Sequence, residues 1–160
     1  MVYAYRSDPD VSRFQGWEPE SSREVEAFIE RLRTMEPLTP GEWFQIGVIL
    51  RDTEELAGDC GLRAWADDPR QVEIGITLAS QFQRQGIASE AFRALLEFLF
   101  TRTVTHRVFC SVDPRNRSCL RLLEKSGMRR EAHMIESLWI KGSWMDEVVF
   151  AILRREWEQD

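Results

Sequence analysis

The stretch QFQRQGIASEAFRALLEFLF, from Gln81 to Phe100, decides the fold because it joins a polar turn to an amphipathic helix. The helix is indicated by apolar residues that recur at helical spacing and form one stripe: Ile87, Ala91, Leu95, Phe98 and Leu99. Gly86 stands where the helix begins. The first N–H groups of a helix lack partners and, with the helix dipole, attract phosphate. The pattern therefore predicts either an anion-binding helix mouth at residues 83–89 or a plain strand-to-helix turn, because short glycine-containing turns are common.

Upstream of this helix, the sequence predicts one surface helix and three strands. Ser21 is a typical helix cap, and the apolar residues of the helix after it are Val25, Phe28, Ile29 and Leu32. Residues 43–50 and 55–65 are short apolar or alternating runs with a polar turn between them, which is typical of an antiparallel hairpin. Residues 71–78 alternate between apolar and other residues, so a third strand is expected there.

Downstream, a strand, a helix and a closing hairpin are expected. HRVFCSV (residues 106–112) is typical of a strand, and NRSCLRLLEKSG of a helix with Asn116 at its start and Gly127 just beyond its end. Residues 131–140 and 144–153 predict two strands joined by the turn KGS. The order of elements predicts an α/β fold, in which helices flank a mixed, mostly antiparallel sheet. We expect residues 1–160 to form a single domain.

Composition excludes several classes of protein. No apolar run approaches the roughly 20 residues of a membrane span, and the start lacks the regions of a signal peptide, so we expect a cytoplasmic protein. Cys60, Cys110 and Cys119 are odd in number and irregularly spaced, which favours reduced thiols over disulfides or a metal site. A formal charge of −6 argues against nucleic-acid binding and favours a cationic partner such as an amine.

A second motif, DPRNRSCLRLLEKSGM, lies at residues 113–128. Together with the phosphate-binding turn, it allows a more specific prediction of the ligand. QRQGIASEA resembles the acetyl-coenzyme A signature of the GNAT acetyltransferase superfamily, and NRSCLRLLEKSGMRREA resembles the segment that follows it in those enzymes. The opening SDPDVSRFQGWEP and the closing KGSWMDEVVFAILRREW are similar to the branch with the ribosomal-protein N-acetyltransferases. The resemblance covers nearly the whole chain and implies an acyltransferase with acetyl-coenzyme A as its cosubstrate.

The resemblance also implies which residues bind the cosubstrate. The strand before the signature would splay from its neighbour, and its backbone around Thr77, Leu78 and Ala79 would pair with the pantetheine arm. Backbone N–H groups would surround the pyrophosphate along the loop formed by Gln83, Arg84, Gln85, Gly86, Ile87, Ala88 and Ser89. Asn116 would bond the pantetheine or the neighbouring loop. Four arginines are either phosphate contacts or a solvated charged face: Arg84, Arg115, Arg117 and Arg121.

Two features depart from the family pattern. The family usually has a strand before SDPD, so either this chain is truncated or its sheet lacks an edge strand; an uncovered edge can pair with a second chain, which makes a homodimer one expectation. Cys119 replaces a common serine, one proposed proton donor to the departing thiolate. Cys119 is therefore either that donor or a small buried apolar residue. The adjacent Ser118 points about 100° away on a helix.

Transfer to an amine requires a base, because an amine near neutral pH is mostly ammonium. Glu73 is the best candidate, since it lies on the face of its strand opposite the apolar residues and shortly before the loop. It could equally face solvent or pair across the sheet. Glu18 and Asp146 are weaker candidates that would hold the ammonium group of the substrate. A backbone N–H near Leu78 or Ala79 would stabilise the oxyanion.

Aromatic residues indicate the acceptor side less specifically. Four tryptophans on loops and strands are expected either to face the acceptor or to fill the core: Trp17, Trp65, Trp139 and Trp144. Histidine is a common residue type for base chemistry, but His106 and His133 lie away from the motifs, so we expect surface or structural roles.

The sequence thus predicts an N-acetyltransferase that moves acetyl to a primary amine by direct attack, without a metal or a covalent intermediate. A nucleophilic role for Cys119 has no support, because no histidine lies beside it in sequence. The alternative is a non-catalytic module that binds acyl-coenzyme A and lacks the base. A nucleotide-binding P-loop is disfavoured because no Lys-Ser/Thr pair follows Gly86. The acceptor, the length of the acyl group and the oligomeric state stay open.

Overall fold

A six-stranded sheet forms the centre of the computed structural model, which describes residues 1–158. The strands lie in the order β1-β2-β3-β4-β6-β5. Their bounds are β1 Phe44–Ile49, β2 Leu56–Ala64, β3 Gln71–Leu78, β4 Arg107–Val112, β5 Arg129–Ile140 and β6 Ser143–Leu153. Among these six strands, β3 and β4 are paired in parallel and all other neighbours are antiparallel. The prediction of a mixed, mostly antiparallel sheet flanked by helices is confirmed.

The helices are α1 Val2–Arg6, α2 Pro9–Ser12, α3 Ser22–Thr34, α4 Ile87–Arg102, α5 Arg117–Lys125 and α6 Arg154–Trp157, with a 3₁₀ turn, η1, at Ser80–Phe82. The cap expected at Ser21 is present, because its side chain accepts a hydrogen bond from the N–H of Glu24. The segment before it contains two further short helices, α1 and α2, in addition to the one surface helix predicted upstream of α4. Within residues 1–158, no helix is both long and apolar enough to cross a bilayer.

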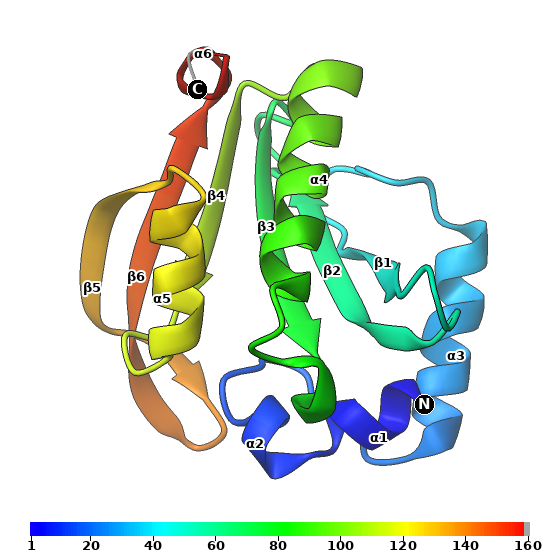
Figure 1. The fold of residues 1–160 in the computed structure, drawn as a ribbon. Coiled ribbons are helices and arrows are strands. Elements are labelled where there is room, and N and C mark those ends of the chain that lie inside the picture. Colours follow the sequence, from blue (N-terminus) through cyan, green and yellow to red (C-terminus); the bar gives the residue numbers. More distant parts are fainter. Residues whose placement is uncertain (159–160) are drawn as a thin grey trace.

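The main core lies between one face of the sheet and helices α4 and α5 (Figure 1). The helices contribute Phe92, Leu95, Leu96, Leu99, Phe100, Leu122 and Leu123, and the sheet contributes Leu62, Val72, Ile74, Val108, Val148, Phe150 and Ile152. Each of these residues is at most 9% exposed, which is the burial expected of a close-packed core. Because Val72 and Ile74 face this core, the residues that alternate with them, Glu73 and Gly75, lie on the opposite face.

The predicted apolar stripe of α4 is wrong at Phe98, which does not face the main core. Its side chain is 45% exposed, whereas Leu95 and Leu99 are buried. Phe98 lines a groove of about 710 Å³ between α4 and β1, together with Ile46 and Ile49. β1 lies at the edge of the sheet, so this side of α4 has no further strand to pack against.

The N-terminal helices α1 and α2 lie against the opposite face of the sheet, where a buried polar cluster joins α1 to β2. Tyr5 donates a hydrogen bond of 2.5 Å to Asp59 of β2, and Arg6 forms an ion pair with the same carboxylate. Burial and the adjacent Asp59 raise the pKa of Tyr5 far above its usual value, so its hydroxyl keeps its proton. This cluster fixes α1 and α2 beside the ends of β2 and β3.

β3 and β4 are neighbours along only part of their length. Their parallel pairing runs from Gln71 with Arg107 to Glu73 with Phe109, and ends there. Beyond these pairs, the two strands diverge toward the end of the sheet where α2 lies (Figure 1). Backbone groups along the second half of β3 are therefore not used by β4.

Candidate functional site

The loop between β3 and α4 presents a run of unused backbone donors. β3 ends at Leu78, η1 follows, and α4 begins at Ile87 after Gly86. Gly86 has φ 85° and Arg84 has φ 61°, both in the left-handed region. Over the part of the chain that the structure describes, the N–H groups from Arg84 to Ser89 donate to no other protein group. An added Cβ at Gly86 would meet nothing within 4 Å, so the loop faces open space.

The glutamines of this loop hold its shape. The Nε2 of Gln83 donates to the carbonyl of Leu78 at 3.0 Å, and the Nε2 of Gln85 donates to that of Gln81 at 2.7 Å. The side chains of Gln83 and Gln85 therefore bond within the loop, and its backbone N–H groups remain for a ligand. Six N–H groups beside a helix N-terminus suit the oxygen atoms of a pyrophosphate.

The free backbone of β3 faces the place where β4 has separated. The N–H of Ala79 donates to the carbonyl of Ala57 at 2.9 Å, so it points toward β2. Because backbone groups alternate between the two sides of a strand, Thr77 points the same way, and Ile76 and Leu78 point toward β4. This corrects the expectation for Ala79, whose N–H is not free to stabilise an oxyanion, and leaves Leu78 as the better placed donor.

Asn116 and the arginines near α5 divide into structural and free groups. The Oδ1 of Asn116 accepts a hydrogen bond of 3.1 Å from the N–H of Cys119, so Asn116 caps α5. Arg115 forms an ion pair of 2.6 Å with Asp113. Arg117 and Arg121 are exposed and form no ion pair with any residue from 1 to 158. They are the arginines of α5 left for an anion.

Cys119 is half-buried and packs against the main core. Burial raises the pKa of its thiol to about 11, so the thiol stays neutral near neutral pH. A neutral thiol is a poor nucleophile. His133 bonds to Asp146 at 2.8 Å, and His106 lies at the start of β4, so neither is placed as a base for Cys119.

Glu73 lies where the pairing of β3 with β4 ends, on the face opposite the main core. It forms a cross-strand ion pair with Arg63 of β2, and its side chain is 13% exposed. Arg63 also stacks on Trp43 at 4.9 Å. The structure thus contains the cross-sheet pairing that the sequence left open as the alternative for Glu73, beside the position expected of a base.

The loop between α2 and α3 forms one wall on this same face. Gln15 accepts a hydrogen bond of 3.0 Å from the hydroxyl of Thr77 at the end of β3. Lys141, in the turn between β5 and β6, donates to the carbonyl of Ser12 at 2.8 Å and to Glu18 at 2.6 Å. Lys141 lowers the pKa of Glu18, so the charge of Glu18 already has a partner.

The predicted aromatic residues do not form one cluster. Trp139 and Trp144 lie opposite each other near the β5–β6 turn, in edge contact at 5.4 Å, and are 59% and 55% exposed. Trp17 instead packs on Phe28 of α3 at 4.6 Å. Trp65 packs on Phe109. Only the first pair presents large apolar surface to solvent beside the wall formed by the α2–α3 loop.

A carboxylate that sequence reasoning missed lies beside the separated end of β4. Glu147 of β6 accepts hydrogen bonds from Ser111 at 2.5 Å and from Ser137 at 2.7 Å. The alternation of β6 places Glu147 on the face opposite Val148, but only the strand register shows which hydroxyls it meets. Among residues 1–158, no group of three or more His, Cys, Asp or Glu side chains is arranged to hold a metal ion.

Comparisons with known proteins agree on one family. The family model described as an acetyltransferase (GNAT) domain matches residues 1–129. An uncharacterised N-acetyltransferase of Bacillus subtilis, YnaD, is 31% identical over 98% of this chain and 88% of its own length. The ribosomal protein uS5-alanine N-acetyltransferase of Escherichia coli is 26% identical over 52% of this chain and 43% of its own length.

Solved structures show the same fold. A GNAT-family acetyltransferase from Bacillus anthracis has a TM-score of 0.84 and 26% identity, over 96% of this chain and 87% of that one. Spermidine N-acetyltransferase from Vibrio cholerae, in complex with CoA and spermine, has a TM-score of 0.82 and 21% identity, over 98% of this chain and 90% of that one.

Proposed function

Because this chain belongs to the GNAT acetyltransferase family, we propose that it transfers the acetyl group of acetyl-coenzyme A to a primary amine by direct nucleophilic attack. The acceptor is either a protein N-terminus or a small-molecule amine. The observation that carries the proposal is the run of six unused N–H groups from Arg84 to Ser89, at the start of α4 and beside the free edge of β3. Such a run fits a pyrophosphate, and the free edge fits an extended chain with amide groups.

Different groups of the chain bind different parts of acetyl-coenzyme A. The N–H groups from Arg84 to Ser89 hold the pyrophosphate, while Arg117 and Arg121 add positive charge nearby. Ile76 and Leu78 pair their backbone with the pantetheine arm, which brings the acyl end to the place where β3 and β4 separate. Acetyl-coenzyme A supplies a thioester, whose carbonyl carbon is the electrophile.

Two chain groups would assist the attack. The N–H of Leu78 donates to the developing oxyanion. Glu73 accepts a proton of the ammonium group, directly or through water. Its ion pair with Arg63 places a positive charge against one carboxylate oxygen, so the other oxygen is the one available for this proton.

Names of relatives bear on the acceptor. One relative is named for an alanine of ribosomal protein uS5 and another for spermidine, and both names point to an amine acceptor. The loop that holds Trp17 and Glu18 and the turn that holds Trp139 and Trp144 would form the acceptor side. Their sequence and geometry favour neither acceptor.

The proposal is tested by release of coenzyme A thiol from acetyl-coenzyme A. The acceptors are spermidine, a short peptide with N-terminal alanine, a free amino acid and an aminoglycoside. We expect turnover with at least one amine, and a loss of about 10²-fold in kcat/KM for Glu73→Gln. Glu42→Gln, an exposed carboxylate outside the site, is the control. Full activity of Glu73→Gln across pH would remove Glu73 from the mechanism.

A second function is favoured by one observation. Glu73 forms an ion pair with Arg63, as expected of a module that binds acyl-coenzyme A without turnover. Such a module would bind acetyl-coenzyme A in calorimetry and release no thiol with any amine of the panel.

A further inference from the structure

We propose that Glu147, with Ser111 and Ser137 as its hydrogen-bond donors, receives the ammonium group of the acceptor and takes its proton before attack. The inference rests on the proposed function and adds a second carboxylate to it: Glu147 takes the proton that the ammonium group loses before attack, and Glu73 takes the proton that the nitrogen loses after attack. Glu147 lies at the centre of β6, and Ser111 lies next to it on β4.

Ser111 lies at the place where the acyl group would arrive. It follows Phe109, the last residue of β4 paired with β3, by two positions and therefore lies on the same face. Gly75 follows Glu73 by two positions on β3, so Gly75 and Ser111 border the separation from its two sides. An added Cβ at Gly75 would meet nothing within 4 Å, so the space in front of it is open. A small cationic group has room there.

The two hydrogen bonds orient Glu147 toward this space. Ser111 pairs with Val149, so Glu147 is its diagonal neighbour on the same face, and diagonal neighbours are within reach of long side chains. Ser111 donates to Oε1 at 2.5 Å and Ser137 donates to Oε2 at 2.7 Å. Each carboxylate oxygen thus has one neutral donor and retains lone pairs for another.

Glu147 differs from the other acidic candidates in its charge partners. Glu73 has Arg63, Glu18 has Lys141 and Asp146 has His133. Glu147 forms no ion pair with any group in residues 1–158, although it is only partly exposed. A half-buried carboxylate without a cation gains most from a cationic ligand.

The charged groups near Glu147 are paired with residues other than Glu147. Arg115 approaches the same face through Met145, at 3.2 Å from its sulfur, but its guanidinium is paired with Asp113. Burial alone would raise the pKa of Asp113, yet hydrogen bonds from Arg115 outweigh it and lower that pKa. Asp146 alternates with Glu147 on β6, and it bonds His133.

A bulge in β5 supplies the second donor. Met134 pairs with Glu147 and Leu138 with Met145, so three residues of β5 lie opposite Asp146 alone. Within the bulge, Glu136 has φ 46°, and its N–H donates to Asp146 at 2.9 Å. Bulges re-aim side chains near active sites, and this one brings Ser137 onto Glu147.

In the proposed transfer, every proton and every bonding electron pair has a stated destination. The ammonium group gives one proton to Glu147, either directly or by way of Ser111, which passes its own hydroxyl proton on and regains one from the amine. The amine lone pair then forms the C–N bond at the thioester carbon. The C–S bond breaks, its electron pair leaves with sulfur, and the second proton of the nitrogen passes through Glu73 to the thiolate.

The test measures kcat and KM for spermidine and for the N-terminal alanine peptide across pH, with acetyl-coenzyme A affinity measured by calorimetry. For Glu147→Gln we expect unchanged acetyl-coenzyme A affinity and a fall of at least about 10²-fold in kcat/KM for the amine. The activity of the variant should rise with pH until the free amine predominates, while the wild-type profile levels off earlier. Ser111→Ala should show the same change in a weaker form.

Glu97→Gln, an exposed carboxylate on α4, is the matched control and should leave all values unchanged. If Glu147→Gln and Ser111→Ala melt like the wild type and keep its pH profile, Glu147 only supports the bulge and the inference is overturned. If the wild type binds acetyl-coenzyme A but acetylates no amine, the proposed function fails first. The two failures are therefore distinguishable.

Discussion

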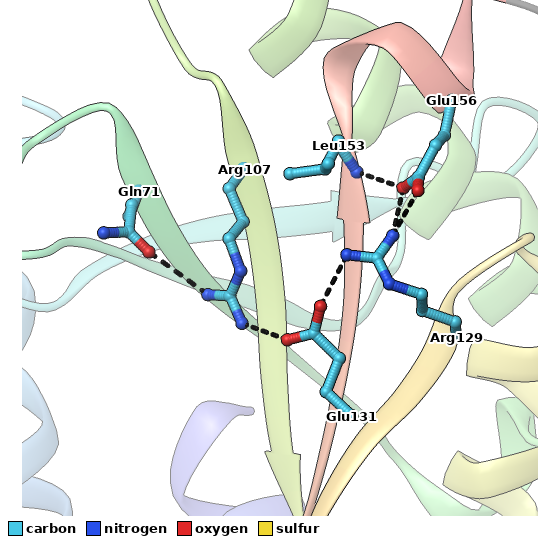
Figure 2. A network of polar contacts seen from close by, with 6 residues as sticks. All are labelled: Gln71, Arg107, Arg129, Glu131, Leu153 and Glu156. Atoms are coloured by element: carbon cyan, nitrogen blue, oxygen red, sulfur yellow. Dashed lines mark hydrogen bonds and ion pairs between the residues drawn. The ribbon is translucent and has the colours of Figure 1, made fainter.

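The two ends of the β3–β4 pair contrast in how their polar groups are satisfied. At the paired end, Arg107 donates to Gln71 at 3.3 Å and to Glu131 at 2.6 Å, and Glu131 also accepts from Arg129 at 2.5 Å. Figure 2 shows this network continuing from Arg129 to Glu156, which accepts from the N–H of Leu153 at 2.7 Å. At the separated end, backbone donors of β3 and of the loop before α4 have no partner among residues 1–158.

The difference shows that one strand pair serves both stability and binding. The paired end joins β3, β4, β5 and α6 through side chains that satisfy one another (Figure 2). Surface ion pairs contribute little singly, but a network fixes several elements at once. Because that end is closed by the protein itself, the other end can keep unsatisfied groups for a ligand. Changes at the two ends should therefore separate stability from binding.

The largest effect is expected at the paired end. Arg154 donates to the carbonyls of Phe100, Thr103 and Thr105, which lie at and just beyond the C-terminus of α4. Arg154→Leu removes these charged donors and leaves partly buried carbonyls without partners, so the free energy of unfolding should fall by about 3 kcal/mol. Denaturant unfolding measures it. Acetyl-coenzyme A affinity of the folded variant should not change, and the exposed neighbour Arg155→Leu is the control.

A smaller effect is expected for the thiol near the separated end. Burial raises the pKa of Cys119 from 9.0 to about 11, so about 100-fold less thiolate is present in the folded protein at pH 8. Alkylation by iodoacetamide should be slower than in the unfolded chain by a similar factor, and should rise about tenfold per pH unit up to about pH 11. Peptide mass spectrometry reports each cysteine. Fast alkylation of Cys119 at pH 8 would instead indicate an activated thiol.

The smallest of the three effects concerns the loop before α4. Gly86→Val places a β-branched residue at φ 85°, where such residues are strained by roughly 1–2 kcal/mol, and the N–H groups around it should shift. We expect acetyl-coenzyme A to bind at least about tenfold more weakly in calorimetry. Gly41→Val, at φ 83° and away from the loop, should lose similar stability with unchanged affinity. Equal losses of affinity in both would refute a phosphate-binding role of the loop.

The sequence predicted features that depend on neighbours along the chain. The cap at Ser21, the start of α4 after Gly86 and the cap at Asn116 follow from local hydrogen-bonding rules, and the structure contains all three. The alternation of residues 71–78 correctly placed Glu73 on the face away from the core. Two motifs in order were enough to predict the family.

Features that depend on strand register could not be predicted in the same way. The pairing of Arg63 with Glu73 and the contacts of Glu147 with two serines join residues far apart in sequence. The bulge that brings Ser137 to Glu147 leaves no clear mark in the residue pattern of β5. Phe98 was placed in the core because helical spacing alone does not reveal that the sheet ends at β1.

The bonds made by Lys141 have a consequence for how the chain is synthesised. The wall formed by the α2–α3 loop is completed by a residue 129 positions after Ser12, and Arg6 needs Asp59, 53 positions after it. Chains emerge from the ribosome with the N-terminus first. Residues 1–18 are thus translated before residue 141, and they gain their last partner only when the β5–β6 hairpin has been made. A chain that terminates before residue 141 would expose this wall to quality control, and one that terminates before residue 59 would also leave Arg6 without its ion-pair partner.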